Sequence, residues 1–380
     1  MDIVSTPGLD DDLIHRVAAL VPWMQQRASQ LDADSAFPTR EIAALHAAGA
    51  LDVALPVDAG PVEAGSSPAG MSDTLADRVA AMLMQVGLGS LAVGRIVEAH
   101  INARHLIARY GSPEQRIKAA KDVRAGELLA LWVTDPPANG LRMSVTAEGV
   151  RLTGGKMFCS AAGHATRAVV TAANEDGAVQ MLVLALGAEE RVEQLAAPLQ
   201  GMRAAVTGAV DFDGCVVSRN ACLGKPGDYM REPDFSAGAW RGSAVALGGL
   251  WGVLAQLQAQ LAAAGRLDDP HHLQRLGSAM IACETGRLWV RRAARVAEDR
   301  IGDPDRVIAY VGLARIAVET ACLDAMRVAQ RSLGLSAFRL GNPVERICRD
   351  LGTYLRQPAP DEVLTEAAAY FARRPCECRL

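Results

Sequence analysis

Apolar positions recur at helical spacing along the first third of the chain. In FPTREIAALHAAGALDVALP, for example, Ile42, Leu45 and Leu51 fall on one stripe of a helix. A segment rich in Gly, Pro and Ser at residues 56–73 interrupts this pattern and predicts a loop. The periodicity then predicts a long helix from Leu91 to Tyr110, which Gly111 ends. Residues 1–123 are therefore predicted to form a helical domain.

The pattern changes twice after this region. Short runs rich in β-branched residues, such as LLALWVT and RAVVTAA, are separated by Gly and Asn-Glu-Asp-Gly turns and predict a β-domain over residues 124–230. Helical periodicity returns near Phe235 in three long runs with small-residue faces, which suit an antiparallel bundle over residues 231–380. The predicted fold class is therefore α+β, with the β-domain between two helical regions.

Composition narrows the possible functions. The chain has 380 residues and a formal net charge of -4, which gives no electrostatic reason to expect nucleic acid or an anionic membrane as a partner. No run of about 18 uncharged apolar residues predicts a membrane span. The N-terminus lacks the pattern of a signal peptide, and the eight scattered cysteines fit reduced thiols. We therefore expect a cytoplasmic protein, and no metal site is predicted.

Five motifs point to one family. In chain order they are YGSPEQR (110–116), LWVTDPPANG (131–140), LTGGKMFCS (152–160), GMRAAVTGAVDFDGCVVSRNACLGKPGDYM (201–230) and NPVERICRD (342–350). Their order and spacing resemble those of the acyl-CoA dehydrogenase superfamily, over almost the whole chain. The resemblance implies an N-terminal helical domain, a middle β-barrel-like domain and a C-terminal four-helix bundle. It also implies an oxidoreductase with FAD as cofactor.

The resemblance places the flavin at two strand ends. An isoalloxazine ring needs hydrogen-bond partners along its polar edge and an apolar contact over its face. By resemblance, Thr134 and Ser160 face the polar edge and Phe158 stacks on the ring. The implied contacts with the flavin come from Leu131, Val133, Thr134, Gly140, Phe158 and Ser160. The alternative for each residue is ordinary strand packing, but two strand ends that each carry a hydroxyl favour FAD.

The ADP half of the cofactor lies across a subunit interface in this family. The resemblance assigns Gln330 and Gly334, in VAQRSLGLSAF, to a neighbouring subunit's cofactor. It assigns Arg266 to the pyrophosphate, and Asp361 or Glu362 to the adenosine. Shared cofactor sites imply a homodimer or homotetramer.

The expected catalytic base is missing from this sequence. In most family members a Glu, nine residues after the Arg of the Arg-Asp pair, abstracts a proton from the substrate. That count from Arg349 arrives at Pro358. A second subfamily carries the Glu immediately before an Arg, and the corresponding pair here is Trp240-Arg241. Neither position holds a carboxylate, and the segment 135–156, which would help to hold a CoA arm, is short.

Three classes of function follow. The first is a dehydrogenase of acyl thioesters or related substrates with a relocated base, for which Glu98 or His100 would serve on the helix that lines the pocket by resemblance. The alternative for that helix face is a solvated surface or one that is salt-bridged to neighbouring elements. The second is a monooxygenase that uses reduced flavin and oxygen, and the third is a flavin-binding or interaction protein without turnover. Trp240, Arg241 and Tyr354 are predicted to border the pocket for a small-molecule substrate, whereas the electron acceptor is not predicted.

Overall fold

The computed structural model describes residues 11–53, 55, 74–187, 191–195, 197–299 and 303–374. The loop predicted at 56–73 lies outside these residues. The first described helices are α1 (Asp11–Ala33), α2 (Thr39–Ala47), α3 (Leu75–Gly89), α4 (Leu91–Tyr110) and α5 (Pro113–Arg124). The predicted bounds of α4 are confirmed, and α5 begins with a capping box in which Ser112 and Gln115 bond to each other's backbone amides.

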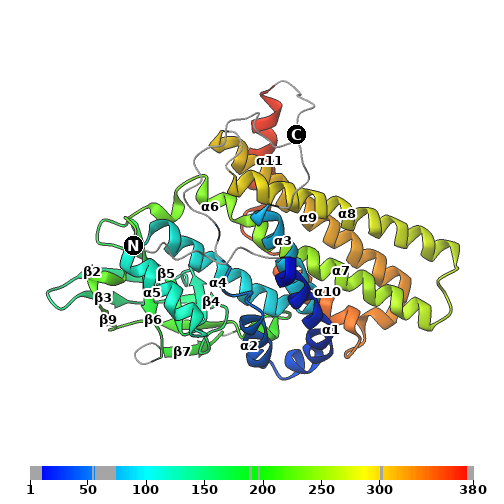
Figure 1. Ribbon diagram of the computed structural model, residues 1–380, viewed down its shortest axis with the longest axis horizontal. Helices are drawn as coiled ribbons and strands as arrows, with labels where there is room; N and C mark the ends of the chain where they lie inside the picture. Colours follow the sequence, from blue (N-terminus) through cyan, green and yellow to red (C-terminus); the bar gives the residue numbers. More distant parts are fainter. Residues whose placement is uncertain are drawn as a thin grey trace.

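The strands of the described residues fall between Leu129 and Leu223. They are β1 (Leu129–Trp132), β2 (Arg142–Val145), β3 (Val150–Thr153), β4 (Gly155–Cys159), β5 (Arg167–Ala173), β6 (Val179–Ala185), β7 (Arg191–Gln194), β8 (Gly208–Asp211), β9 (Val216–Val217) and β10 (Cys222–Leu223). The larger sheet has the order β10-β6-β5-β2-β3-β9, and β1 pairs in parallel with β5. The smaller sheet has the order β4-β8-β7. The two sheets form the β-domain seen on the left of Figure 1.

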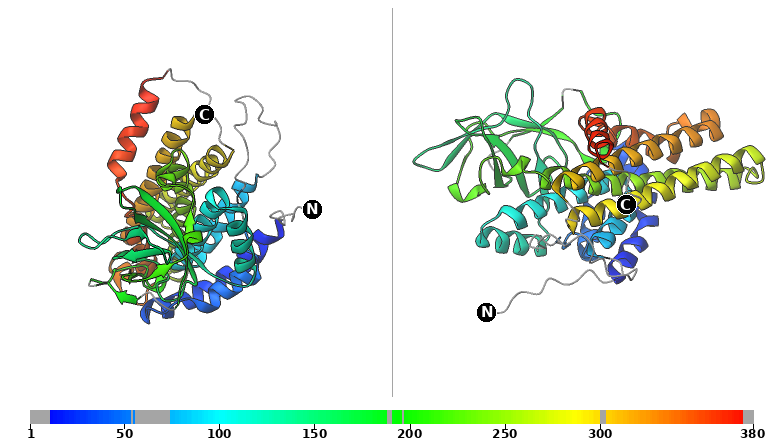
Figure 2. Two further views of the ribbon diagram at one scale, coloured as in Figure 1. Left: turned by 90° about the vertical axis from the view of Figure 1, so that its left-hand side faces the viewer. Right: turned by 90° about the horizontal axis from the view of Figure 1, so that it is seen from above.

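The C-terminal region is helical. Its helices are α6 (Asp234–Ala237), α7 (Ala239–Ala263), α8 (Pro270–Glu298), α9 (Pro304–Leu333), α10 (Pro343–Tyr354) and α11 (Pro360–Ala372). The long helices α7, α8 and α9 pack against one another, α10 packs on α7, and α11 packs on α9. Figure 2 shows this bundle extending away from the β-domain. The predicted sequence of helical, β and helical regions is therefore confirmed.

Small residues allow the helices of the two helical regions to approach closely. A Cβ atom on Gly87 of α3 would lie 2.3 Å from the carbonyl oxygen of Val245 in α7. A Cβ atom on Gly248 would lie 2.2 Å from the carbonyl oxygen of Met84. No side chain fits at either position, so α3 and α7 meet backbone to backbone. This contact joins the N-terminal helices to the bundle.

The segment Asp234–Ala263 is long and apolar enough to cross a membrane, and no other described helix is. However, 67% of its apolar window is buried within the protein. Its apolar character is accounted for by α7, which is packed between α3, α8, α9 and α10.

His100 joins α4 to the β-domain, which corrects its prediction as a base. The backbone amide of Leu129 donates to Nδ1 at 3.0 Å, so Nε2 carries the proton and donates to the carbonyl of Leu51 at 3.0 Å. The ring is fully buried, and this burial lowers the pKa of His100 to about 4. Because both ring nitrogens already have backbone partners, His100 holds the fold and has no nitrogen left for a substrate.

Candidate functional site

A cleft of about 910 Å³ lies between the β-domain and the C-terminal helices. We define the cleft by the side chains that line it from these two regions. From the β-domain come Thr134, Phe158, Ser160, Met202 and Thr207, and from the helical region come Gln330, Phe338, Glu345, Arg349, Tyr354 and Pro358. The cleft thus brings together five of the residues to which the sequence assigned the cofactor or substrate, namely Thr134, Phe158, Ser160, Gln330 and Tyr354.

Phe158 reaches the cleft because its backbone is unusual. It has a φ of 55°, in the left-handed region that aromatic residues rarely adopt. The register between β4 and β8 is irregular at the same place, between Lys156 and Cys159. The Phe158 side chain is 45% exposed as a result, whereas its neighbour Cys159 is fully buried in the core. Such a conformation persists only where the surrounding structure imposes it, and this is common at ligand sites.

Lys156 connects the end of β4 to the residues that follow β1. Its buried ammonium donates to the carbonyl of Val133 at 3.1 Å, to Asp135 Oδ1 at 2.6 Å and to Thr171 Oγ1 at 3.0 Å. Burial lowers the pKa of Lys156, and the ion pair with Asp135 opposes this effect. The next carbonyl along the chain, that of Thr134, accepts from the amide of Met157 at 2.9 Å. The ends of β1 and β4 are therefore held side by side at the cleft.

The remaining flavin-strand predictions do not line the cleft. Leu131 lies in β1, and its side chain packs with a separate apolar cluster beneath α4. The carbonyl of Val133 is occupied by Lys156. Gly140 leaves room for Asp135, whose Oδ1 accepts from the amide of Leu141 at 3.0 Å, and a Cβ on Gly140 would lie 3.1 Å from that side chain. These three residues are therefore engaged in contacts within the β-domain and do not face the cleft.

The position of the missing base is part of the cleft. Pro358 lines it, and the carbonyl of Pro358 accepts from Arg315 Nη2 of α9 at 2.6 Å. Among the described residues that line the cleft, Glu345 carries the sole carboxylate, and Arg349 Nε donates to it at 2.7 Å. Arg349 also pairs with Asp32 at 2.7 Å, and these bonds raise its pKa. No described carboxylate in the cleft is therefore free to take a proton.

Neither family models nor curated proteins match this sequence. Solved structures, in contrast, match nearly the whole chain. Butyryl-CoA dehydrogenase from Megasphaera elsdenii is 17% identical with a TM-score of 0.80, over 98% of this chain and 100% of that one. Dibenzothiophene monooxygenase from Paenibacillus sp. A11-2 is 18% identical with a TM-score of 0.80, over 95% and 97%. Nitrososynthase from Micromonospora carbonacea var. africana is 19% identical with a TM-score of 0.77, over 95% of each chain.

The chain has the acyl-CoA dehydrogenase fold. The resemblance carried by the five motifs is thereby confirmed at the level of the fold. Similar structures include both dehydrogenases and a monooxygenase, so the fold alone does not choose between the first two predicted functions.

Glu98 lies one layer behind the cleft of this acyl-CoA dehydrogenase fold. Arg95 donates to Oε2 of Glu98, and the amide of Asn102 donates to Oε1. Asn102 in turn accepts from Arg241, which pairs with the mostly buried Glu298 at 2.7 Å. Both oxygens of Glu98 are therefore engaged in a network that leads away from the cleft, which is a poor arrangement for a base.

Trp240 and Arg241 belong to the same network and do not border the cleft. Trp240 is fully buried, and its indole N–H donates to Glu298 Oε1 at 3.0 Å. Burial raises the pKa of Glu298, and Arg241 opposes this effect. The predicted aromatic pair at the substrate pocket is thus wrong for Trp240, although Tyr354 does line the cleft.

Of the residues predicted to hold the ADP half, Gln330 lines the cleft of this chain, and the others lie away from it. Arg266 is exposed between α7 and α8, and Gly334 is exposed at the end of α9. Asp361 and Glu362 are exposed in the first turn of α11. Their roles toward a neighbouring subunit's cofactor stay predictions.

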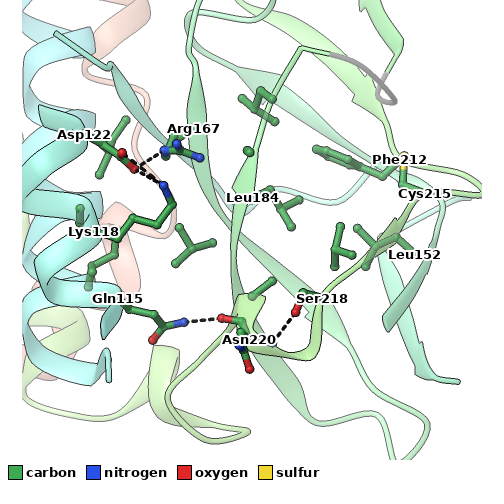
Figure 3. A pocket seen from close by; sticks show the side chains of 18 of the residues that line it. Gln115, Lys118, Asp122, Leu152, Arg167, Leu184, Phe212, Cys215, Ser218 and Asn220 are labelled. Atoms are coloured by element: carbon green, nitrogen blue, oxygen red, sulfur yellow. Dashed lines mark hydrogen bonds and ion pairs between the residues drawn. The ribbon is translucent and has the colours of Figure 1, made fainter. Parts of the chain in front are cut away.

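A second cavity, of about 510 Å³, lies between α5 and the larger sheet (Figure 3). We call it the α5 cavity. Its wall is mostly apolar, with Leu152, Leu184 and Phe212 facing inward. The polar groups at its edge are paired: Asp122 is bound by Lys118 and Arg167, and Gln115 donates to the carbonyl of Asn220 at 2.9 Å. No motif from the sequence contributes a predicted site residue to it.

Sequence reasoning missed Arg315 at the candidate site. This residue lies in the middle of α9, within a helical run whose local pattern is that of any bundle helix. Its contact with Pro358 joins α9 to the segment between α10 and α11, and only the tertiary fold brings the two together. No motif or spacing in the sequence carries that information.

Proposed function

We propose that this protein is a flavin-dependent oxidoreductase that uses reduced flavin and oxygen to oxidise a small molecule. The observation that carries this proposal is a cleft with the flavin-side residues present and no free carboxylate. General-base catalysis contributes about a hundred- to ten-thousand-fold to proton abstraction. A dehydrogenase without that base would be slow, whereas oxygen chemistry does not require a carboxylate to take a proton from carbon.

The residues of the cleft fit a flavin. The hydroxyl-bearing Thr134 and Ser160 and the exposed ring of Phe158 all line it. A bound flavin would supply electron transfer and reaction with oxygen. The protein's part would be to hold the ring against Phe158, to exclude water and to orient the substrate beside it.

Solved structures of similar fold support both the flavin and the oxygen chemistry in this proposal. One of them is the Paenibacillus monooxygenase in complex with FMN and indole, which is 18% identical to this chain with a TM-score of 0.79. We propose FAD as the cofactor of this protein because its sequence resembles the motifs that bind the longer molecule.

We also propose that the protein is a homo-oligomer. The exposed face of α8 carries four large apolar side chains, Leu273, Met280, Ile281 and Leu288, each more than half exposed. Water-exposed apolar groups gathered on one helix are typical of a protein contact surface. A partner that covers this face would also bring a second chain near the exposed residues predicted to contact its cofactor.

The deciding experiment compares two reactions of the FAD-loaded protein. Under anaerobic conditions, straight-chain acyl-CoA thioesters should leave the flavin oxidised. In air, with the flavin kept reduced by an added reductase, an aromatic heterocycle such as indole should gain an oxygen atom, which ¹⁸O₂ and mass spectrometry would detect. Rapid anaerobic bleaching by an acyl-CoA would contradict the proposal and favour a dehydrogenase, and Glu98→Gln would then test the relocated base.

A further inference from the structure

A small recess adjoins the cleft behind Tyr354. Its volume is about 190 Å³, and it shares Arg95, Tyr354 and Gln357 with the cleft. Its other walls come from α4, α7 and α9, with Glu98 on the first helix, Ser243 on the second and Arg315 on the third. One water occupies about 30 Å³ in the liquid, so the recess has room for roughly six non-hydrogen atoms. A ligand in the cleft could therefore place one short substituent there.

Two hydrogen-bond donors in the walls of the recess have no partner within the described chain. The hydroxyl of Tyr354 is buried, with the residue only 6% exposed, and it bonds to nothing. Burial raises the pKa of Tyr354 well above its usual value, so the hydroxyl keeps its proton. Nε of Arg315 is also buried and unbonded, although Nη2 of the same side chain binds Pro358. Buried donors without partners are rare in folded proteins and mark places where a ligand or water belongs.

Two arginines, Arg95 and Arg315, and two carboxylates, Glu98 and Glu319, line the recess, so its formal charges balance, but the ion pairs are distributed unevenly. Each of its carboxylates already has an arginine of its own: Glu98 is paired with Arg95, and Glu319 is paired with Arg356. Arg315 has no carboxylate within ion-pair distance among the described residues; burial lowers its pKa, and the charge of the nearby Glu319 opposes this effect. A desolvated guanidinium with a free N–H is best satisfied by an anionic oxygen.

We propose that the recess binds a carboxylate of the substrate, with Arg315 and Tyr354 as the residues that determine this specificity. This inference rests on the proposed function and names the class of substrate: a small molecule with an apolar body in the cleft and a carboxylate on a short arm. Tyr354 donates its O–H to one carboxylate oxygen and Arg315 donates its Nε–H to the group. Ser243 stands in the same wall.

The test measures binding separately from turnover. Isothermal titration of the FAD-loaded protein would compare benzoate, phenylacetate, 3-phenylpropionate and 4-phenylbutyrate with the four corresponding primary amides. The best acid should bind about tenfold more tightly than its amide, because a hydrogen bond to a charged group is stronger than one to a neutral group. Equal binding of every acid and amide, or no binding of any acid, would overturn the proposal.

Variants assign the effect to the recess. Tyr354→Phe should lower the affinity for the acid about fivefold and leave the amide affinity less changed, while Arg315→Gln should remove the preference for acid over amide. Two matched changes on α9, Tyr310→Phe and Arg327→Gln, lie outside the residues that line the recess and should leave the preference intact. If the preference for acid over amide survives Arg315→Gln, the proposed role of the recess is contradicted. Arg315→Lys, which keeps the charge, should retain part of the preference even though the bond to Pro358 changes.

The same measurements distinguish this inference from the proposed function. Selective binding of the acids without any oxygen incorporation would leave the recess inference standing and defeat the monooxygenase proposal. Oxygen incorporation that is equally fast with acids and amides would support the monooxygenase proposal and contradict the recess inference.

Discussion

The cleft and the α5 cavity differ in what their polar groups do. At the α5 cavity, Asp122 is bound by Lys118 at 3.3 Å and by Arg167 at 2.5 Å. At the recess behind the cleft, Tyr354 and Arg315 each keep a donor without a partner. Both cavities are large enough for a ligand, so volume does not separate them. The pairing does: Arg167 Nε and Asp122 Oδ2 lack a hydrogen bond of ordinary geometry but form an ion pair, whereas Tyr354 Oη and Arg315 Nε have neither kind of partner among the described residues. A fold retains such unsatisfied donors against a cost of about 1–3 kcal/mol each.

Helix α4 contributes residues to both cavities, although no residue lines both. Arg95, near the start of α4, lines the cleft, and Ile107, near its end, lines the α5 cavity. His100 lies between these two residues and fastens the helix to the β-domain. A change in α4 should therefore affect both cavities, whereas changes elsewhere should affect one.

Blocking each cavity should produce the largest contrast. Gly352 lines the cleft on α10, and Gly352→Trp would place a large ring where we expect the flavin. Flavin affinity should fall by more than about a hundredfold, since the ring and the cofactor cannot share the space. Ala221→Trp in the wall of the α5 cavity is the matched control, and the flavin absorbance of the purified protein should be unchanged. Flavin loss in the control alone would exchange the roles of the two cavities.

Acidification should destabilise the attachment of α4 to the β-domain through His100. His100 has a pKa of about 4 in the folded protein and of about 6.5 when unfolded, so the unfolded chain binds the proton more readily. Its contribution is present above pH 6.5 and is lost as the pH falls toward 4, by up to about 3 kcal/mol. Urea unfolding between these pH values would measure the effect. His100→Gln should flatten this part of the pH dependence, and an unchanged slope would show that other groups cause it.

Removing a paired group and removing an unpaired group should affect stability differently. Arg167→Met at the α5 cavity leaves Asp122 with Lys118 alone, and it should cost about 1–3 kcal/mol because the side chains of Asp122 and Arg167 are mostly buried. Tyr354→Phe removes a hydroxyl that bonds to nothing, so the ligand-free protein should be at least as stable as the wild type. Urea unfolding of both variants without added ligand tests this contrast. A loss of more than about 1 kcal/mol in Tyr354→Phe would reveal a partner for its hydroxyl.

The smallest effect should come from single hydroxyls. Ser160→Ala or Thr134→Ala in the cleft should weaken flavin binding by roughly fivefold each, since a hydrogen bond contributes about 1 kcal/mol. Ser218→Ala in the wall of the α5 cavity removes the same atom and should change nothing. Equilibrium titration of the apoprotein with FAD would compare the three variants. Equal behaviour of all three would remove the hydroxyls from the proposed site.

The sequence predicted the fold more completely than it predicted the site. Local patterns and ordered motifs were enough for α4, for the strands and for the positions of Thr134, Phe158, Ser160 and Pro358, because each depends on its own neighbours in the chain. His100 and Trp240 could not be placed from the sequence, since their partners, Leu51, Leu129 and Glu298, come from distant segments. Arg315 was missed for the same reason. Residues whose role depends on a partner from a distant segment can be placed only in the tertiary structure.

The left-handed backbone of Phe158 has a consequence for the kinetics of ligand capture. The ring is already directed toward the cleft by a backbone that the irregular β4–β8 pairing accommodates, so part of its ordering precedes the arrival of a ligand. Immobilising a side chain on binding ordinarily costs about 0.5–1.5 kcal/mol of entropy. Here that ordering takes place during folding, and the encounter with a planar ligand begins on a preorganised surface.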